Sequence, residues 1–295
     1  MSDSSGNDSP DLSAEADAAR AEQLESWERA AVAWGKRADE VRAFGMPVSE
    51  WLIDRLELQP GQELLELAAG PGDTGFLAAE LIAPGGTLIS SDAAEAMLDV
   101  ARGRAAAMGI ENVRFQRLEL EWIDLPTASV DVILCRWGIM LILDPAAAAR
   151  EARRVLRPGG GRIALSVWAA AEHNPWASVP TQALVELDHI PPPDRNQPGL
   201  FALAAPGGLR ELLEGAGFGD IELETIELER AASSVAAFIA QTRTMSGAFA
   251  EAVNRRSESE RLAVEREIAT LAEPYTDARG AVRFPARALV AVATA

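Results

Sequence analysis

Apolar residues along this chain recur in two spacings that alternate. Strand-like segments lie at 63–68, 87–91, 113–116, 130–135, 162–168, 221–226 and 288–294, of which 221–226 alternates apolar and polar residues. Helix-like stretches lie at 74–82, 94–108, 146–156, 209–216 and 233–273. Strands that alternate with helices of about a dozen residues indicate right-handed crossovers and a parallel sheet covered on both faces. The pattern therefore predicts an α/β, doubly wound fold.

Three segments depart from this alternation. Residues 1–25 carry seven acidic side chains against one basic residue, Arg20, and few large apolar groups, which predicts a mobile acidic tail. Residues Trp27 and Trp34 belong to an apolar helical stripe, for which packing is the first interpretation and covering a ligand the second. The proline-rich stretch after residue 168 is too long for a simple connection, so we expect a lid or a flexible insert.

Composition narrows the classes of partner. The 295 residues are 48% hydrophobic and 24% charged, which is typical of a globular protein. With 27 basic and 45 acidic side chains, the formal net charge is −18. A nucleic-acid backbone or an anionic membrane surface would be repelled by such a chain. We therefore expect no nucleic-acid and no membrane partner.

Cysteine and histidine usage also limits the chemistry. The single cysteine, Cys135, cannot form an internal disulfide, and no paired Cys or His spacing predicts a zinc site. The first 25 residues lack a basic and apolar leader, and no uncharged apolar run reaches the roughly 18 residues of a membrane span. We expect a cytoplasmic protein without a structural metal.

A glycine-rich loop follows the first predicted strand. Residues 66–75 read Glu-Leu-Ala-Ala-Gly-Pro-Gly-Asp-Thr-Gly, and Asp92 lies at the end of the second predicted strand, 20 residues after Gly72. Glycines allow close backbone approach to a ligand, and an acid at that distance binds a ribose hydroxyl pair. Taken alone, the loop fits NAD as well as other nucleoside ligands.

Charge separates these ligands. Asp73 stands in the first turn of the helix where a diphosphate would bind, and Glu66 adds a second acid just before the glycines. Both acids disfavour a pyrophosphate. S-adenosylmethionine carries no phosphate, and its sulfonium and ammonium groups are cationic. The sequence therefore favours S-adenosylmethionine over NAD.

With these residues in view, the chain resembles the class I S-adenosylmethionine-dependent methyltransferases, in particular the branch of the quinone-biosynthesis (ubiquinone/menaquinone) methyltransferases. The resemblance covers roughly residues 34–168 and includes the Leu-Arg-Pro-Gly-Gly turn at 156–160. It implies a Rossmann-like, mostly parallel seven-stranded sheet with helical lid insertions. The domains then follow as a disordered tail 1–25, a helical cap 26–60, a cofactor-binding core 61–170, a proline-rich lid 171–206, a core continuation 207–230, a helical lid 231–280 and a final core strand 281–295.

The resemblance also assigns site residues. The family's first motif corresponds to Glu66, Ala68, Gly70 and Gly72, with Ala68 standing where the family usually has glycine. Asp92 corresponds to the acid that binds the ribose hydroxyls. The residues beside the adenine and the wall next to the sulfonium correspond to Ala93, Met97, Glu119, Leu120 and Arg136. Capping of the next helix by Asp92, an exposed role for Glu119 and a surface ion pair for Arg136 are the alternatives.

No catalytic base stands out. His173 follows the fifth predicted strand but is more typical of a surface histidine, and Cys135 of a small buried hydrophobe. Methyl transfer from a sulfonium is an in-line displacement in which charge disappears, so alignment and exclusion of water carry most of it. The nucleic-acid methyltransferases usually have an Asn/Asp-Pro-Pro-aromatic motif where this chain has Cys135-Arg136-Trp137-Gly138.

These observations favour a methyltransferase for a small, aromatic, quinone-like or secondary-metabolite acceptor. The first alternative is an NAD(P)-dependent oxidoreductase, motivated by the spacing of Gly70, Gly72 and Gly75. The second is a protein that binds the cofactor without transferring methyl groups. The identity of the acceptor, the methylated atom and the formation of a homodimer are not decided by the sequence.

Overall fold

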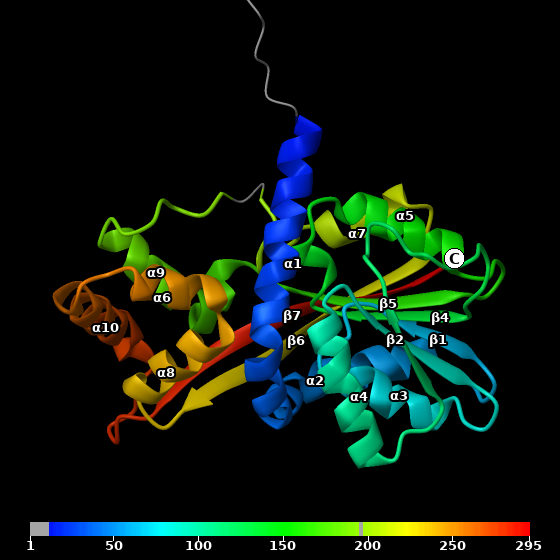
Figure 1. Ribbon diagram of the computed structural model, residues 1–295, viewed down its shortest axis with the longest axis horizontal. Coiled ribbons are helices and arrows are strands. Elements are labelled where there is room, and N and C mark those ends of the chain that lie inside the picture. Colours follow the sequence, from blue (N-terminus) through cyan, green and yellow to red (C-terminus); the bar gives the residue numbers. More distant parts are fainter. Residues whose placement is uncertain (1–11, 195–196) are drawn as a thin grey trace, which may run out of the picture.

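The computed structural model describes residues 12–194 and 197–295. Its centre is a seven-stranded sheet in the order β3-β2-β1-β4-β5-β7-β6 (Figure 1). The strands are β1 (Glu63–Glu66), β2 (Thr87–Asp92), β3 (Val113–Arg117), β4 (Val132–Arg136), β5 (Arg162–Trp168), β6 (Gly219–Ala232) and β7 (Val282–Thr294).

The first five strands pair in parallel, and β7 runs antiparallel to both β5 and β6. Apolar residues such as Leu65, Ile89 and Ile133 are fully buried in the centre of the sheet. Strands covered on both faces need continuous apolar runs rather than alternating ones, and β1, β4 and β5 have that character. The predicted doubly wound, mostly parallel sheet is confirmed.

Helices cover both faces of the sheet. In Figure 1, α5 and α7 lie above it and α2, α3 and α4 below it. The helices are α1 (Leu12–Lys36), α2 (Ala38–Leu56), α3 (Asp73–Leu81), α4 (Glu95–Met108), α5 (Pro145–Val155), α6 (Pro175–Glu186), α7 (Gly208–Gly215), α8 (Val235–Met245), α9 (Gly247–Asn254) and α10 (Glu258–Ala272). Three 3₁₀ turns are η1 (Ile139–Leu141), η2 (Ala171–His173) and η3 (Glu273–Tyr275). Within the described ranges, no helix has the length and apolar character needed to span a membrane.

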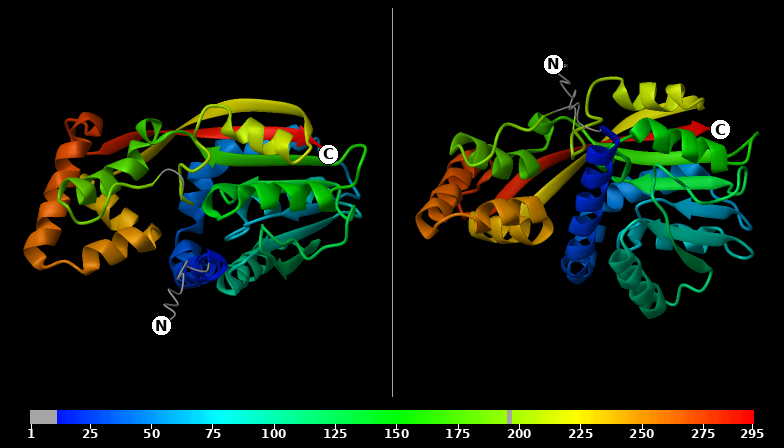
Figure 2. Two further views of the ribbon diagram at one scale, coloured as in Figure 1. Left: turned by 90° about the horizontal axis from the view of Figure 1, so that it is seen from above. Right: turned by 45° about the horizontal axis from the view of Figure 1, so that its top comes forward.

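Strands β6 and β7 extend beyond the rest of the sheet and carry α6, α8, α9 and α10 (Figures 1 and 2). These helices form a second hydrophobic core with the projecting part of β7, in which Phe238, Ile268 and Phe284 are buried. We call this assembly the helical unit. The predicted insert at 171–206 supplies its helix α6, and residues 195–196 of that insert lie outside the described ranges.

The ranges predicted for β6 and β7 were too short. Strand β6 continues past residue 226 to Ala232, and β7 begins at Val282, before residue 288. Along 282–287 the burial of β7 alternates, as in a strand with one covered face, but Pro285 argues against a strand in the sequence. Pairing with β5 stops at Ala288, whereas pairing with β6 continues to Val282. Pro285 therefore sits where β7 has only one neighbour, and there a missing N–H is tolerated.

The prediction of a disordered tail over 1–25 is wrong from residue 12 onward, and residues 1–11 lie outside the described ranges. Helix α1 starts at Leu12 and continues through the predicted stripe to Lys36. Alanine, glutamate and leucine dominate its first turns, and these residues favour a helix. Arg20 and Gln23 also bond to loops more than 100 positions further along the chain. The acidic charge and low apolar content of this segment had favoured a prediction of disorder over its helix propensity, and its distant hydrogen bonds are not visible in the sequence.

Candidate functional site

A cavity of about 390 Å³ opens at the carboxyl ends of β1, β2 and β4, where parallel sheets of this topology bind ligands. Its wall comes from the loops after these strands and from helix α1. The lining residues are Arg20, Ala21, Gln23, Leu24, Trp27, Trp34, Val41, Ala68, Ala69, Gly70, Pro71, Asp92, Ala93, Met97, Glu119, Leu120, Glu121, Arg136, Trp137, Gly138, Leu141 and Ile142.

The loop after β1 turns sharply over the sheet. Ala68, Gly70 and Gly72 all have positive φ, at 50°, 53° and 87°. Only glycine adopts this region without strain, so Ala68 holds a conformation that the family's usual glycine would hold freely. Gly138 makes room for it, because a Cβ at Gly138 would lie 2.5 Å from the Cβ of Ala68. The loop thus presents its backbone to the cavity.

Asp92 ties this loop to the next helix. Its Oδ2 accepts a hydrogen bond from the Gly70 N–H at 2.9 Å, and its Oδ1 accepts one from the Ala94 N–H at 3.0 Å. Burial raises the pKa of Asp92, and these backbone donors act against that shift. Asp92 therefore ties the glycine loop to Ala94, which precedes α4, and it borders the cavity. The alternative that Asp92 caps α4 is wrong, because Ala94 is the N-cap residue and Asp92 accepts from its N–H rather than from the first turn of the helix.

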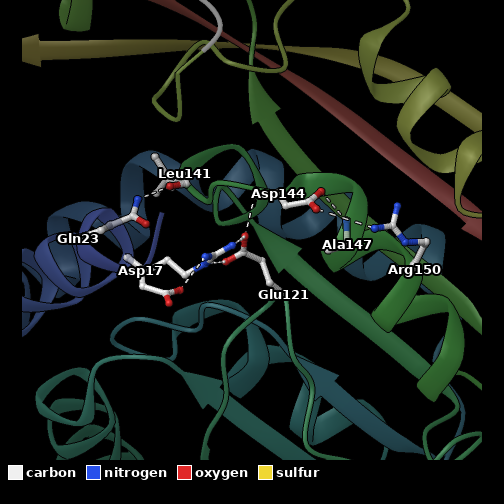
Figure 3. Close-up of polar contacts among 8 residues, drawn as sticks. Asp17, Gln23, Glu121, Leu141, Asp144, Ala147 and Arg150 are labelled. Atoms are coloured by element: carbon white, nitrogen blue, oxygen red, sulfur yellow. Dashed lines mark hydrogen bonds and ion pairs between the residues drawn. The ribbon is translucent and has the colours of Figure 1, made fainter. Parts of the chain in front are cut away.

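The loop after β3 brings acids to the same cavity. Glu119 is exposed and lines the wall. Glu121 is held on both sides: Arg20 donates from Nε at 3.0 Å and from Nη2 at 3.1 Å, and the Asp144 N–H donates at 2.8 Å (Figure 3). The Glu121 carboxylate therefore joins the start of α5 to helix α1.

Glu66 and Asp73 do not line the cavity, which corrects the expectation that they form part of an acidic cleft. Each is only 3% exposed. Glu66 accepts a hydrogen bond from the Gly75 N–H at 2.8 Å, and burial raises its pKa to about 8. Asp73 pairs with Arg104 at 2.6 Å. The raised pKa keeps Glu66 protonated, and Arg104 neutralises Asp73, so neither residue repels a diphosphate in the cavity.

Gly72 also lies outside the lining, because its Cα faces the Phe76 ring, where a Cβ would approach within 2.4 Å. It ends the loop and starts α3. Of the ten residues assigned to the cofactor from the sequence, Glu66 and Gly72 do not line the cavity and instead contact α3 beneath the glycine loop. The other eight border the cavity, namely Ala68, Gly70, Asp92, Ala93, Met97, Glu119, Leu120 and Arg136.

Arg136 and Trp137 form the wall at the end of β4. The Arg136 side chain is 10% exposed, its guanidinium carbon lies 4.8 Å from the centre of the Trp137 ring, and one of its nitrogens is 3.8 Å from Asp73 Oδ2. Burial lowers the pKa of Arg136. Trp137 has a φ of 60° and stacks on Trp168 with 4.2 Å between ring centroids. Trp137 is thus fixed between a cation and a second indole.

Helix α1 supplies the part of the wall that the sequence did not reveal. Arg20, Gln23 and Leu24 line the cavity from a segment assigned to the tail. Trp27 and Trp34 line it as well and contact each other edge to face at 5.7 Å. The tryptophan stripe was the usable signal: its interpretation as packing is confirmed, since the indoles pack against α4. Covering a ligand stays a prediction, which the place of both indoles in the cavity wall supports.

The remaining candidates lie elsewhere. His173 is exposed in η2 and does not line the cavity. Burial raises the pKa of the Cys135 thiol to about 12, so the thiolate is not available as a nucleophile at neutral pH. No group of His, Cys, Asp and Glu side chains within 12–194 and 197–295 could hold a metal ion. None of the described residues of 171–206 or 231–280 borders the cavity, so their role as lids stays a prediction.

Known proteins resemble this chain in sequence and fold. Residues 58–189 match the family described as methyltransferase domain. Over 209 residues the chain is 33% identical to nocamycin O-methyltransferase of Saccharothrix syringae, an alignment that covers 68% of this chain and 74% of that protein.

A second relative covers a shorter stretch. Over 114 residues the chain is 32% identical to the ubiquinone/menaquinone biosynthesis C-methyltransferase of Hahella chejuensis, covering 38% of this chain and 46% of that protein. The chain therefore spans less than half the length of this relative. The YcgJ protein of Bacillus subtilis superposes with a TM-score of 0.54 at 19% identity, covering 83% of this chain and 97% of that one, which shows a common fold.

Proposed function

The chain belongs to the class I S-adenosylmethionine-dependent methyltransferases, and on that premise we propose that it transfers the methyl group of S-adenosylmethionine to a small-molecule acceptor. The observation that carries the proposal is the cavity at the carboxyl ends of β1, β2 and β4. It joins the glycine loop, Asp92 and the 119–121 segment in one wall. These are the groups that the sequence connects with the cofactor.

In this proposal, the two ends of the cavity bind different parts of the cofactor. Asp92 still has lone pairs beyond its two backbone bonds, so it can accept from the ribose hydroxyls. Ala93, Met97, Glu119 and Leu120 would surround the adenine. Ala68 and Gly70 would lie along the methionine part, and Arg136 at the end of β4 would face its carboxylate. Glu66 and Gly72 would act by shaping the loop.

The transfer itself needs alignment more than acid–base chemistry. When S-adenosylmethionine is bound, its sulfonium supplies the activated methyl group. The described lining includes no histidine, tyrosine or lysine. Of its three acids, Asp92 and Glu121 are engaged by other groups, and Glu119 would lie beside the adenine rather than at the acceptor. We therefore infer that the walls formed by Trp34, Trp137 and the glycine loop exclude water and align the acceptor.

A small acceptor is supported by two observations. The formal charge of −18 disfavours nucleic acid, and both relatives described above are named for small-molecule products. An oxygen or a carbon acceptor is compatible with those names. The NAD(P) alternative loses its support, because the chain's family transfers methyl groups.

Calorimetry with S-adenosylmethionine and S-adenosylhomocysteine tests cofactor use, and we expect both to bind in a one-to-one ratio. Lack of binding by both would contradict the proposal. Incubation with methyl-labelled cofactor and a panel of small phenols, enols, carboxylic acids and quinols then tests transfer. Binding of the cofactor without transfer to any physiological acceptor would favour the non-transferring alternative.

A further inference from the structure

Helix α1 stands between the two halves of the molecule. In Figure 1 it crosses the front of the fold, with the sheet and α3–α5 on one side and the helical unit on the other. One face of α1 closes the cavity through Leu24, Trp27 and Trp34. Its middle approaches the helical unit, where a Cβ at Gly247 would lie 3.6 Å from Ser26 Oγ. A ligand in the cavity is therefore covered by α1.

The first half of α1 is held by polar contacts to the loops around the cavity. Arg20 bonds to Glu121 through two nitrogens, and the Gln23 amide donates to the Leu141 carbonyl (Figure 3). The Arg20 and Glu121 side chains are 37% and 14% exposed, so the pair is reached by water. Contacts of this kind break at modest cost compared with apolar core contacts.

Further along, α1 caps another helix. The N-terminus of α4 has no cap from its own neighbouring side chain, since its N-cap residue is Ala94. Glu28 of α1 supplies one instead, accepting from the N–H groups of Glu95 at 2.8 Å and Ala96 at 2.9 Å. A carboxylate at a helix N-terminus is favourable through the helix dipole. The contact fixes where α1 rests when it covers the cavity.

The apolar contacts of α1 are separate from the main core. Ala31, Ala94 and Met97 form a small buried cluster, against which Trp27 and Trp34 pack. The sheet core does not include any of these residues. Local opening is easiest where few apolar contacts are lost. Helix α1 can thus lift from α4 without exposing the core of the sheet.

A break in the helix lies at the other end of α1. The helix ends at Lys36 and α2 begins at Ala38, so Arg37 alone connects them. The Arg37 backbone has φ −113° and ψ 13°, outside the helical region. Helix α2 beyond it is anchored in the main core by Val48, Leu52 and Leu56. Rotation about this single residue would move α1 while α2 stays in place.

We propose that α1 is a hinged lid over the cofactor cavity, with its hinge at Arg37 and with the Arg20–Glu121 ion pair as the latch that limits the rate of cofactor exchange. The identity of the ligand in this inference rests on the proposed function. A latch stabilises the closed lid whether or not the cavity is filled. Its loss speeds both entry and release and leaves the affinity nearly unchanged.

Stopped-flow binding of S-adenosylhomocysteine to the full chain tests the latch. For Arg20→Gln we expect the association and dissociation rate constants to rise together by about twofold to fivefold, the size expected for one partly exposed ion pair. The dissociation constant should change by less than about twofold. Glu121→Gln, which breaks the same pair from the other side, should reproduce the result.

Arg29→Gln is the matched control, because Arg29 pairs with Glu25 on the exposed face of the same helix and does not border the cavity. We expect it to leave both rate constants unchanged. Rate constants equal to wild type in both latch variants would overturn the lid. A rise in the dissociation rate alone would also overturn it, because Arg20 would then act as a direct ligand contact. Absence of binding to the wild type would refute the proposed function instead.

Discussion

Among the acids that the sequence singled out, Asp92 borders the cavity and Glu66 supports it from inside the core. The sequence placed both in one group because each ends a strand at the edge of the sheet where the glycine loop lies. The side to which a side chain points depends on backbone turns, such as the positive φ values at Ala68 and Gly70. Spacing along the chain does not encode those turns, so eight of the assigned residues border the cavity and Glu66 and Gly72 do not, while the binding of a cofactor by these residues stays a prediction.

The first prediction concerns Asp92. Substitution Asp92→Ala removes the acceptor for Gly70 and Ala94 and, in the proposed site, for the ribose. We expect S-adenosylhomocysteine binding to weaken by on the order of 1–3 kcal/mol, because buried donors lose their partner. Isothermal calorimetry measures this. Asp99→Ala is the control, since Asp99 is exposed on α4 and pairs only with Arg102. Equal affinity of Asp92→Ala and wild type would remove Asp92 from the site.

The second prediction concerns pH. Burial raises the pKa of Glu66 from 4.5 to about 8, so the native state keeps a proton that the unfolded chain releases. The resulting stabilisation is complete below the unfolded pKa and is lost as the pH rises through the native pKa. From about pH 5 to pH 8, wild type should lose about 1 kcal/mol per pH unit relative to Glu66→Gln. Denaturant unfolding at each pH checks this, and parallel curves for the two proteins would show that Glu66 is ionised in the native state.

At the scale of elements, the strands β1, β2, β4 and β5 were predictable because mostly buried runs lie between turn residues. The edge strand β3 was predictable from its alternating residues. Strands β6 and β7 were underestimated, since exposed Glu and Arg side chains alternate with buried residues and Pro285 interrupts the pattern. Helix α1 was missed over 12–25 because its anchors, Glu121 and Leu141, are far away in the sequence. The pattern of apolar residues predicts elements that are stabilised by neighbouring residues. It does not predict the first half of α1, which is held by distant loops.

The third prediction concerns how two loops fit together. Gly138→Ala would bring a Cβ to 2.5 Å from Ala68 Cβ and 3.1 Å from Cys135 Sγ. The glycine loop must then shift, so we expect a loss of stability of about 1–3 kcal/mol and a weaker affinity for S-adenosylhomocysteine. Gly103→Ala is the control, because no other atom lies within 4 Å of its Cβ position in the middle of α4. There we expect a gain of about 0.5–1 kcal/mol. A Gly138→Ala protein with wild-type affinity would show that the loop accommodates the methyl group.

At the scale of the whole molecule, the net charge of −18 says little about the cavity. The cavity wall carries both signs of charge, because Asp92, Glu119 and Glu121 line it together with Arg20 and Arg136. The argument from charge for a cationic, phosphate-free nucleoside had included Glu66 and Asp73, which are neutralised or protonated in the interior. The preference for S-adenosylmethionine over NAD now depends on family membership and on the acids that remain in the wall.

The fourth prediction follows for global stability. A ligand that binds only the folded chain stabilises it, by about 2.7 kcal/mol at 100 times its dissociation constant. We expect S-adenosylhomocysteine to raise the unfolding midpoint in a dose-dependent manner and NADH and NADPH to leave it unchanged. Differential scanning fluorimetry compares the three ligands side by side. Stabilisation by a nicotinamide cofactor alone would reverse the assignment.

The position of the helical unit has a consequence for how such a chain can diversify. Helices α8 to α10 are all inserted between β6 and β7, at the far end of a hairpin whose other end completes the sheet. Their core is separate from the core of the sheet and is shared with α6 and the projecting ends of β6 and β7. Residues of α8 to α10 that do not approach α1 can therefore be replaced while the strand order keeps its packing. Substitutions in α8 to α10 should therefore cost the sheet little stability. Exchange of this segment between relatives is a practical route to engineered variants.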